Sequence, residues 1–411
     1  MNIRIGVACA ALAGALAGCA QQPVQTSAPD LLTLDTHVDI PLDYMREPRY
    51  DVGGDSALKV DLGKMERGGL DGAFFIIYVG QGPLTEAGYA DAVAQAERKY
   101  SAIALMLEKY PDRIRLATTP TQVRENQAHG LLSAMIGIEN PYSLGHDLSR
   151  LDTAHARGAR YVGLTHVGNN AVCSSANPDT EAGEPAHNSA QDPGMSEFGR
   201  ALVARANALG MMVDVSHASD KCVLDAIAAS RAPVFASHSS ARGLVDVPRN
   251  LPDDLLRAIA DDGGVVQAVA YYEFVKHDPA RQAAEKALQQ KIAREAGAGE
   301  FDWDVHGELP ALAAGMARIE REHPLATLQE YVDHIDYMVE LVGIDHVGIA
   351  SDFDGGGEVT GWMDASESPN VTAELRKRGY SDSDIARLWG GNLLRVWQAA
   401  GDAADAGPGA P

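Results

Sequence analysis

The sequence predicts an α/β fold, a (β/α)8 TIM-type barrel, and three observations support that prediction. Short β-branched runs that end in a polar or charged residue recur eight times along the chain. Helical patterns lie between most of these runs. The length of 411 residues is within reach of one large α/β barrel. An open, doubly wound sheet is the alternative, but it usually has fewer strands, and no G-x-G-x-x-G motif follows the first run.

The eight runs have the composition of strands that are buried on both faces. Most are nearly continuous stretches of apolar residues, as expected of a parallel sheet covered by helices. In chain order they are Leu31–Asp39, Gly72–Val79, Leu131–Glu139, Arg160–His166, Met211–His217, Ala232–His238, Gly263–Ala270 and Asp345–Asp352.

Helical periodicity fills most of the intervals between the runs. Ser219 and Ser383 stand where helix starts are expected, because a serine hydroxyl can cap the first free N–H groups. The predicted helices are Tyr89–Tyr110, Met195–Leu209, Asp220–Ala229, Asp253–Asp261, Leu325–Leu341 and Ser383–Gln398.

Two segments fall outside the strand–helix alternation. Residues 278–324 are charged, Ala-rich and helix-prone, and they interrupt the interval between the seventh and eighth runs. We expect them to form an insertion over or beside the barrel mouth. Residues 401–411, with the sequence GDAADAGPGAP, have the composition of a disordered tail. The expected barrel domain therefore covers residues 31–400.

The N-terminus has the pattern of a secreted, lipid-anchored chain. Arg4 precedes an apolar stretch of small residues at 5–17, which is too short to span a bilayer comfortably. The stretch ends in Leu-Ala-Gly-Cys19 and resembles a bacterial lipoprotein signal, with an ordinary secretory signal as the alternative. The resemblance implies cleavage of residues 1–18, lipidation of Cys19 and a tether over residues 19–30. It implies an envelope location, on an outer membrane and facing the periplasm.

Charge and cysteine content narrow the functional classes. The formal net charge of −23 makes binding to nucleic acid through phosphates a poor hypothesis. It also leaves the lipid as the only expected contact with a membrane. Cys173 and Cys222 are 49 positions apart and form no disulfide framework, so we interpret both as free thiols.

Imidazoles and carboxylates stand at the ends of six of the eight predicted strands. In such barrels the active site lies at the carboxyl ends of the strands, so these side chains are expected to converge. The first run ends in His37-Val-Asp39, whose two polar side chains face the same way on a strand. The others end in Glu139, His166, His217, His238 and Asp352.

This donor set predicts a binuclear metal site. His37 and Asp39 would hold one ion, His217 and His238 from neighbouring strands would hold a second, and Glu139 can bridge with its two oxygens. Nitrogen and oxygen donors without a thiolate suit Zn²⁺ or a similar divalent ion. Two such ions would activate a water and polarise a carbonyl.

The order and spacing of several motifs resemble the membrane dipeptidase (renal dipeptidase) family of zinc peptidases over nearly all of residues 31–400. The motifs are Asp35-Thr-His37-Val-Asp39, Gly137-Ile-Glu139-Asn140, Leu164-Thr-His166, Asp214-Val-Ser-His217-Ala-Ser219, Ser237-His238-Ser-Ser-Ala241, Arg249-Asn250, Ser351-Asp352-Phe-Asp354-Gly355 and Gly391-Asn-Leu-Leu-Arg-Val396.

The resemblance implies a role for each residue. The five metal ligands are those named above, with Glu139 as the bridge in the reaction centre. Asp352 takes a proton from the attacking water and passes it to the leaving amine, and Asp354 is a weaker candidate for that role. His166 contacts the scissile peptide and its developing oxyanion. Arg249 pairs with the C-terminal carboxylate of the substrate, for which a guanidinium fork is well matched.

The expected activity is a zinc-dependent dipeptidase with two Zn²⁺ ions per chain, which tolerates a D-residue at the C-terminal position. One alternative is a binuclear-metal amidohydrolase acting on a non-peptide amide or lactone. Those sites typically start with H-x-H and use a modified Lys as the bridge, whereas no Lys ends a strand here. The other alternative is a non-catalytic, peptide-binding lipoprotein, which would not need all five ligands and Asp352. The expected partner is a small dipeptide, and the sequence leaves open whether the chain forms a homodimer.

Overall fold

The protein is described by a computed structural model over residues 31–407, except residues 302 and 308 and the side chains of residues 303 and 304. The predicted signal peptide, Cys19 and the tether lie outside the described residues, as do residues 408–411.

Eight parallel strands form the barrel, which confirms the predicted fold class, and each overlaps one of the eight predicted runs. Neighbouring strands pair in the order β1-β2-β4-β5-β6-β7-β8-β9. They are β1 (Leu34–Asp39), β2 (Gly72–Tyr78), β4 (Leu132–Glu139), β5 (Ala159–Gly163), β6 (Met212–Asp214), β7 (Phe235–Ser239), β8 (Val265–Val269) and β9 (Val347–Ala350). A ninth strand, β3 (Ile114–Leu116), pairs with β4 off this path. Sequence analysis missed it because three residues carry too little periodicity.

The barrel closes just beyond the end of β9. The N–H of Asp352 donates to the carbonyl of His37 at 3.1 Å, and the N–H of Asp39 donates to the carbonyl of Phe353 at 2.9 Å. A parallel bridge joins Val38 and Phe353. The two ends of the sheet therefore meet through the residues that the sequence places in the active site.

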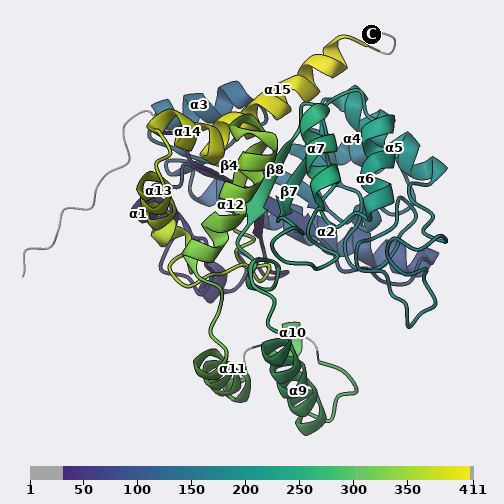
Figure 1. Ribbon diagram of the computed structural model, residues 1–411, viewed down its shortest axis with the longest axis vertical. Helices are drawn as coiled ribbons and strands as arrows, with labels where there is room; N and C mark the ends of the chain where they lie inside the picture. Colours follow the sequence, from purple (N-terminus) through teal and green to yellow (C-terminus); the bar gives the residue numbers. More distant parts are fainter. Residues whose placement is uncertain (1–30, 302, 308, 408–411) are drawn as a thin grey trace, which may run out of the picture.

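Helices surround the strands (Figure 1). The predicted helices Asp220–Ala229 and Asp253–Asp261 match α6 and α7 residue for residue. Ser219 caps α6, as predicted, whereas the last predicted helix begins at Asp382 and is capped by Ser381 rather than beginning at Ser383. The α-helices are α1 (Leu62–Gly68), α2 (Glu86–Lys109), α3 (Pro120–Ala128), α4 (Ser149–Ala156), α5 (Glu197–Leu209), α6 (Asp220–Ala229), α7 (Asp253–Asp261), α8 (Tyr272–Val275), α9 (Pro279–Glu295), α10 (Trp303–His306), α11 (Pro310–Glu322), α12 (Leu328–Val342), α13 (Ser368–Lys377), α14 (Asp382–Ala386) and α15 (Asn392–Asp405).

Five short helical turns complete the elements of the described residues. They are η1 (Pro48–Tyr50), η2 (Pro141–Leu144), η3 (Ile344–His346), η4 (Ala365–Glu367) and the π-helical η5 (Arg387–Gly391), which joins α14 to α15. The helix α15 extends to Asp405, so the prediction of disorder from residue 401 is wrong for residues 401–405. Among the described residues, no helix combines the length and the apolar character that a bilayer span requires.

Aromatic rings fill the amino-terminal end of the barrel. Phe74 lies 5.1 Å from Tyr161 and 5.7 Å from Trp397 of α15, and Tyr161 lies 5.3 Å from Phe235, all between ring centroids. These four side chains are at most 3% exposed. They form an apolar floor, and the hydroxyl of Tyr161 extends from it toward the polar strand ends.

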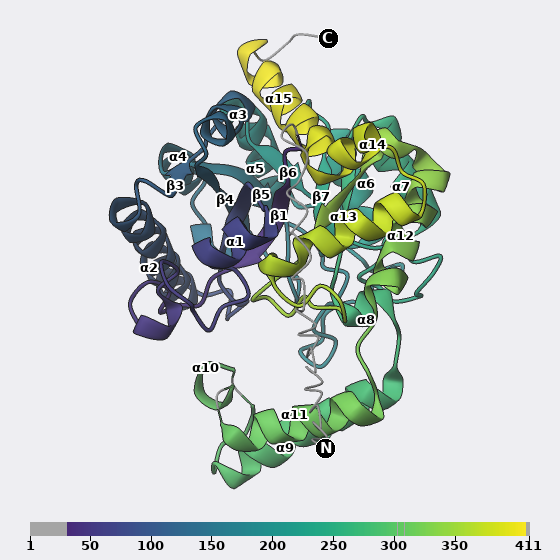
Figure 2. The same ribbon diagram turned by 90° about the vertical axis from the view of Figure 1, so that its left-hand side faces the viewer.

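The segment 278–324 forms a helical arm, α9 to α11, that projects from the barrel and lies on the side opposite α15 (Figures 1 and 2). Leu288, Ile292, Leu312 and Ile319 give the arm a small apolar core of its own. At its base, the guanidinium of Arg281 pairs with Glu285 and Glu320 and lies 4.7 Å from the ring of Tyr272 on α8. The arm is therefore anchored to the segment that follows β8.

Cys173 and Cys222 form a disulfide, so the interpretation of both as free thiols is wrong. Their Cα atoms are 6.1 Å apart, because the long segment between β5 and α5 folds back over the start of α6. The same approach pairs Ser175 with Ala218 in an antiparallel bridge. Sequence separation alone gave no sign of this proximity.

His334 on α12 is buried and neutral, and it links the loop after β7 to the end of α8 at the barrel mouth. Its Nδ1 accepts from the N–H of Ala241 at 3.2 Å, and its Nε2 donates to the carbonyl of Val275 at 3.3 Å. Only a neutral imidazole can accept and donate in this way. Burial lowers the pKa of His334 from 6.5 to about 4.

We expect this histidine to destabilise the protein in acid. Because its folded pKa lies below its unfolded pKa, the unfolded chain binds the proton more readily, and stability falls as the pH drops from 6.5 toward 4. At pH 5 the loss relative to pH 7 should be on the order of 2 kcal/mol. Urea unfolding at both pH values, with wild type and His334→Gln, measures it. A variant with the same loss of stability as wild type would contradict the prediction.

Candidate active site

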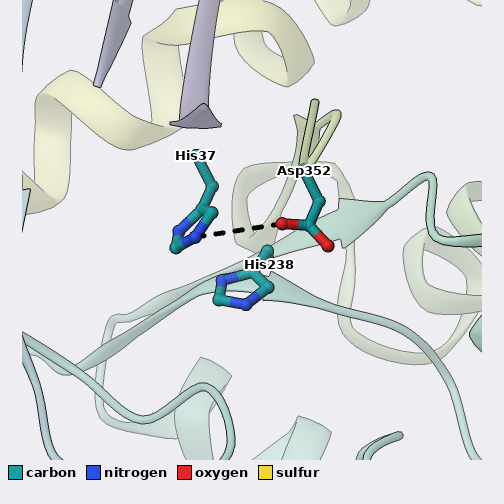
Figure 3. A group of neighbouring side chains, drawn as sticks. All are labelled: His37, His238 and Asp352. Atoms are coloured by element: carbon teal, nitrogen blue, oxygen red, sulfur yellow. Dashed lines mark ion pairs between the residues drawn. The ribbon is translucent and has the colours of Figure 1, made fainter. Parts of the chain in front are cut away.

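The structure brings all the predicted strand-end residues together at the carboxyl ends of the strands. His37 and Asp39 lie on β1, Glu139 ends β4 and His238 lies on β7. The others stand two or three residues beyond a strand: His166 after β5, His217 after β6 and Asp352 after β9. Figure 3 shows His37 of β1, His238 of β7 and Asp352 of the loop after β9 converging on one place.

The backbone is strained at several of these positions. Asn140, His217, Asp352 and Asp354 all have a φ between 60° and 65°, in the left-handed region that non-glycine residues rarely adopt. Such strain costs of the order of 1–3 kcal/mol for each residue and persists only where surrounding contacts impose it. At His217, the carbonyl accepts from the N–H of Ala176 at 2.7 Å, in the segment locked by the disulfide.

Glu139 lies at the centre of the cluster, and each of its oxygens faces a different set of donors. Its Oε2 is 3.2 Å from Nε2 of His37, which in turn is 3.5 Å from Oδ2 of Asp39. Its Oε1 is 3.1 Å from Nε2 of His217 and 3.4 Å from Nε2 of His238. This is the arrangement of a carboxylate that can bridge two ions.

Three overlapping groups have ligand atoms within 4.8 Å of one another and can hold a metal ion: His37, Asp39 and Glu139; Glu139, His166 and His217; and His37, His238 and Asp352. His166 thus enters a group that the sequence did not predict, with its Nε2 at 4.0 Å from Oε1 of Glu139. His238 lies closer to the same oxygen, and its Nε2 is 2.9 Å from Nε2 of His217.

The protonation of the cluster suits a divalent cation. Burial lowers the pKa values of His217 and His238, and the nearby Arg249 lowers them further, so both imidazoles are neutral. Burial raises the pKa of Glu139, but the imidazoles around it outweigh that effect and hold the pKa well below its usual range. Its buried Oε1 accepts no hydrogen bond from the described residues. A cation between this oxygen and the two imidazoles would satisfy all three groups.

Tyrosine hydroxyls orient two of the imidazoles, and sequence analysis did not find them. Tyr161 lies 3.1 Å from Nδ1 of His37, and Tyr78 lies 3.2 Å from Nδ1 of His166. Both tyrosines lie within predicted strands, where an aromatic residue usually indicates packing. Tyr78 ends β2 as Glu139 ends β4, and the two residues are paired in the strand register. The position of Tyr78 at a strand end was the one sequence feature that could have placed it in the site.

Asp352 is buried beside the metal-binding groups, with its Oδ1 3.9 Å from Nε2 of His37. Burial raises its pKa well above the ordinary value, and the carboxylates Asp39 and Glu139 add to the effect, while His37 and Arg249 oppose it. Asp354 instead accepts hydrogen bonds from the N–H groups of Lys59 and Val60 at 2.9 and 3.3 Å. Its contacts hold the loop, which favours Asp352 over Asp354 for proton transfer.

Arg249 is a buried cation without a carboxylate partner among the described residues. It is 3% exposed, its Nη1 donates to Oγ of Ser239 at 2.9 Å, and its Nη2 donates to the carbonyl of His238 at 2.7 Å. In the described part of the chain its Nε has no acceptor, and its Cζ lies 5.3 Å from the ring of Phe274. Burial lowers its pKa to about 10, which still leaves it charged at neutral pH.

Gly355 allows the loop after β9 to approach the site. A Cβ at this position would lie 2.2 Å from Oδ2 of Asp39 and 2.6 Å from Oδ1 of Asp352. We therefore expect Gly355→Ala to displace one or both carboxylates and to weaken binding of a divalent metal ion at least tenfold. Zinc titration of the metal-free protein measures this effect. Gly54→Ala is the control, because a Cβ there would meet no described atom within 4 Å. Equal zinc affinities of the two variants would contradict the prediction.

Comparisons with known proteins agree with this geometry. The family model for "Membrane dipeptidase (Peptidase family M19)" matches residues 22–409. Dipeptidase tcpJ of Claviceps purpurea (strain 20.1) is 30% identical over 368 residues, which cover 88% of this chain and 74% of that protein.

Solved structures give the same result. The probable dipeptidase PvdM from Pseudomonas aeruginosa is 36% identical, with a TM-score of 0.78 and coverage of 91% of this chain and 96% of that one. A metallo peptidase from Rhodobacter sphaeroides, solved with a phosphinate mimic of the dipeptide L-Ala-D-Ala, is 25% identical, with a TM-score of 0.70 and coverage of 90% and 99%. The family match and these relatives together show that the chain belongs to the membrane dipeptidase family, peptidase family M19, whose members are metallo-dipeptidases.

Proposed function

We propose that this chain is a zinc-dependent dipeptidase that holds two Zn²⁺ ions and accepts dipeptides with a C-terminal D-residue. His37 and Asp39 would hold one ion, His217 and His238 would hold the other, and Glu139 would contribute one oxygen to each. The nitrogen and oxygen donor set supports zinc. The division of donors between the two oxygens of Glu139 supports two ions rather than one.

The buried guanidinium of Arg249, which has no carboxylate partner among the described residues, is the observation that carries the proposal. A buried charge without a partner is costly, so a site that retains one is built for a ligand of opposite charge. Arg249 lies next to His238 and is held there by its hydrogen bond to the carbonyl of that residue. In a dipeptide the free carboxylate lies one residue from the scissile bond. Binding of that carboxylate by Arg249 would place the peptide bond at the metal cluster.

The chain's own residues supply the remaining chemistry. When bound, the metal ions supply Lewis-acid chemistry, by lowering the pKa of a water and polarising the scissile carbonyl. Asp352 accepts the proton of the attacking water and delivers it to the leaving amine. His166, held by Tyr78, faces the same space and donates to the oxygen on which negative charge develops.

The relative solved with a mimic of L-Ala-D-Ala supports acceptance of a D-residue. In the proposed site the binding contacts are made to the C-terminal carboxylate and to the peptide bond. The side chain of the last residue is therefore less constrained than those two groups. The physiological substrate would then be a dipeptide of either configuration at its second residue.

The two alternatives from the sequence are less well supported. An amidohydrolase acting on a lactone or a non-peptide amide has no need for a buried guanidinium without a carboxylate partner. A peptide-binding protein without activity has no need for a buried Asp352 beside the metal ligands.

We further propose that Cys19 carries a lipid and anchors the enzyme to the outer membrane, facing the periplasm, on the basis of the Leu-Ala-Gly-Cys sequence.

The metal content and substrate range test the proposal directly. Purified mature protein should contain two divalent ions per chain by elemental analysis. With zinc bound it should hydrolyse both L–L and L–D dipeptides in a panel of such pairs. Absence of bound metal together with no activation by zinc would overturn the proposal, and failure on every L–D substrate would remove the D-residue claim.

Arg249 should make the enzyme discriminate between a free and an amidated C-terminus. Amidation removes the negative charge and leaves the buried guanidinium unpaired, so kcat/KM should fall by at least about 10²-fold for wild type. Arg249→Ala should be slow on both forms and discriminate little. Arg249→Lys should recover only part of the activity, because an ammonium cannot make a two-pronged contact. Equal kcat/KM values of wild type on the dipeptide with a free C-terminus and on its amide would show that Arg249 does not bind the carboxylate.

Asp352→Asn should reduce kcat by at least about 10²-fold, because the amide keeps the shape of the side chain but cannot accept the proton of the water. Zinc content should stay near that of wild type, which separates loss of proton transfer from loss of metal. If this variant retains most of its activity, Asp352 is not the proton-transfer group.

A further inference from the structure

Three of the four imidazoles in the active site have a hydroxyl at Nδ1. The hydroxyl of Tyr161 contacts Nδ1 of His37, and that of Tyr78 contacts Nδ1 of His166, as described above. The hydroxyl of Ser237 lies 2.8 Å from Nδ1 of His238. Nδ1 of His217 has no partner among the described residues. A partner at Nδ1 decides which ring nitrogen carries the hydrogen, and so whether Nε2 is free to bind a metal.

Ser237 is in turn bonded to a buried carboxylate, Asp214, at the end of β6. The Ser237 hydroxyl lies 2.7 Å from Oδ2 of Asp214. The other oxygen, Oδ1, accepts the N–H of Ser216 at 2.9 Å and the N–H of Ser237 at 2.8 Å. Asp214 and Ser237 are at most 1% exposed. Two backbone donors therefore fix the orientation of the carboxylate, and its second oxygen points at the serine.

The direction of these hydrogen bonds follows from which of the three groups can donate and which can accept. A carboxylate only accepts, so the single hydrogen of the Ser237 hydroxyl goes to Asp214. The serine oxygen can then only accept from His238, so Nδ1 of that ring carries the hydrogen. Nε2 is left with a lone pair, and it is the nitrogen that faces Glu139 at 3.4 Å.

We propose that Asp214 is a positioning residue that acts through the Ser237 hydroxyl to hold His238 as the Nδ1–H tautomer, with Nε2 ready to bind the metal. The inference rests on the proposed function, in which His238 is a ligand. Asp214 itself belongs to none of the three groups that can hold a metal ion.

An isosteric change at Asp214 should reverse the direction of the hydrogen bonds. In Asp214→Asn, the two backbone N–H groups require the amide oxygen at the Oδ1 position, so the amide nitrogen faces Ser237. The serine oxygen then accepts from the amide. Its hydrogen turns to Nδ1 of His238 at 2.8 Å, since the next acceptor, Oγ of Ser216, is 3.4 Å away. His238 becomes the Nε2–H tautomer, which cannot bind a metal at Nε2.

This reasoning predicts an unusual pattern among the variants. Asp214→Asn should weaken binding of one of the two zinc ions by about 10–100-fold, the usual effect of removing an outer-shell partner. Ser237→Ala should have a smaller effect, because it frees the tautomer without imposing the wrong one. The double variant should bind zinc as well as Ser237→Ala alone and better than Asp214→Asn, because the harmful donation needs the serine hydroxyl.

The experiment is a zinc titration of the full chain, stripped of metal with a chelator, for wild type and the three variants. Ser240→Ala is the matched control, since it removes another buried hydroxyl of the same segment, which donates to the carbonyl of Val269 at 3.3 Å. It should bind both ions as wild type does. Nitrogen chemical shifts of histidine in the ¹⁵N-labelled, metal-free proteins report the tautomer of His238 independently of metal binding.

The outcomes separate this inference from the proposed function. Wild-type zinc affinity in Asp214→Asn, or a double variant as weak as Asp214→Asn, would overturn the inference, and so would an unchanged His238 tautomer in Asp214→Asn. If wild type itself bound fewer than two ions, the proposed two-zinc site would fail, whereas the tautomer measurement would still decide the role of Asp214.

Discussion

The contact of one buried carboxylate with the surrounding imidazoles is the constraint on which the rest of the active site depends. Glu139 is held at the end of β4, and its two oxygens face donors that come from β1, from β7 and from the segment after β6. In a low-dielectric interior such a charge is tolerable only if it is paired. The same imidazoles that can bind a metal therefore also offset the free-energy cost of burying the Glu139 carboxylate inside the barrel.

The barrel supplies the rigidity that this arrangement needs. Its strands end at one level because each pairs in parallel with its neighbours, and the seam between β9 and β1 is closed by Asp352 and Asp39 themselves. Below the site, the aromatic floor holds Tyr161, whose hydroxyl reaches His37. The apolar core and the polar cluster thus share a side chain, so packing at the floor fixes the orientation of a ligand above it.

Much of the fold and of the site could be predicted from the sequence, because both depend on local patterns. The eight apolar runs mark the strands, and the polar residues at their ends mark the site, since parallel strands in a barrel point the same way. What could not be predicted depends on contacts between distant segments. The Cys173–Cys222 disulfide, the tyrosines at Nδ1 of His37 and His166, and the role of Asp354 in binding the backbone of Lys59 and Val60 all require the fold itself. The helical ending at residues 401–405 escaped prediction because its composition is that of a tail, whereas Arg395 and Trp397 earlier in α15 anchor the helix to the barrel.

The disulfide also has a consequence for how the protein is made. The bond ties the segment that donates to the carbonyl of His217 to α6, and such bonds form and persist mainly in oxidising compartments. A chain synthesised and kept in a reducing cytosol would hold this segment by hydrogen bonds alone, with His217 in its strained conformation under weaker constraint. Preparations from oxidising and reducing hosts would therefore share the same barrel but differ in how firmly the His217 side chain is held. The redox conditions under which a sample was made would then have to be stated with it.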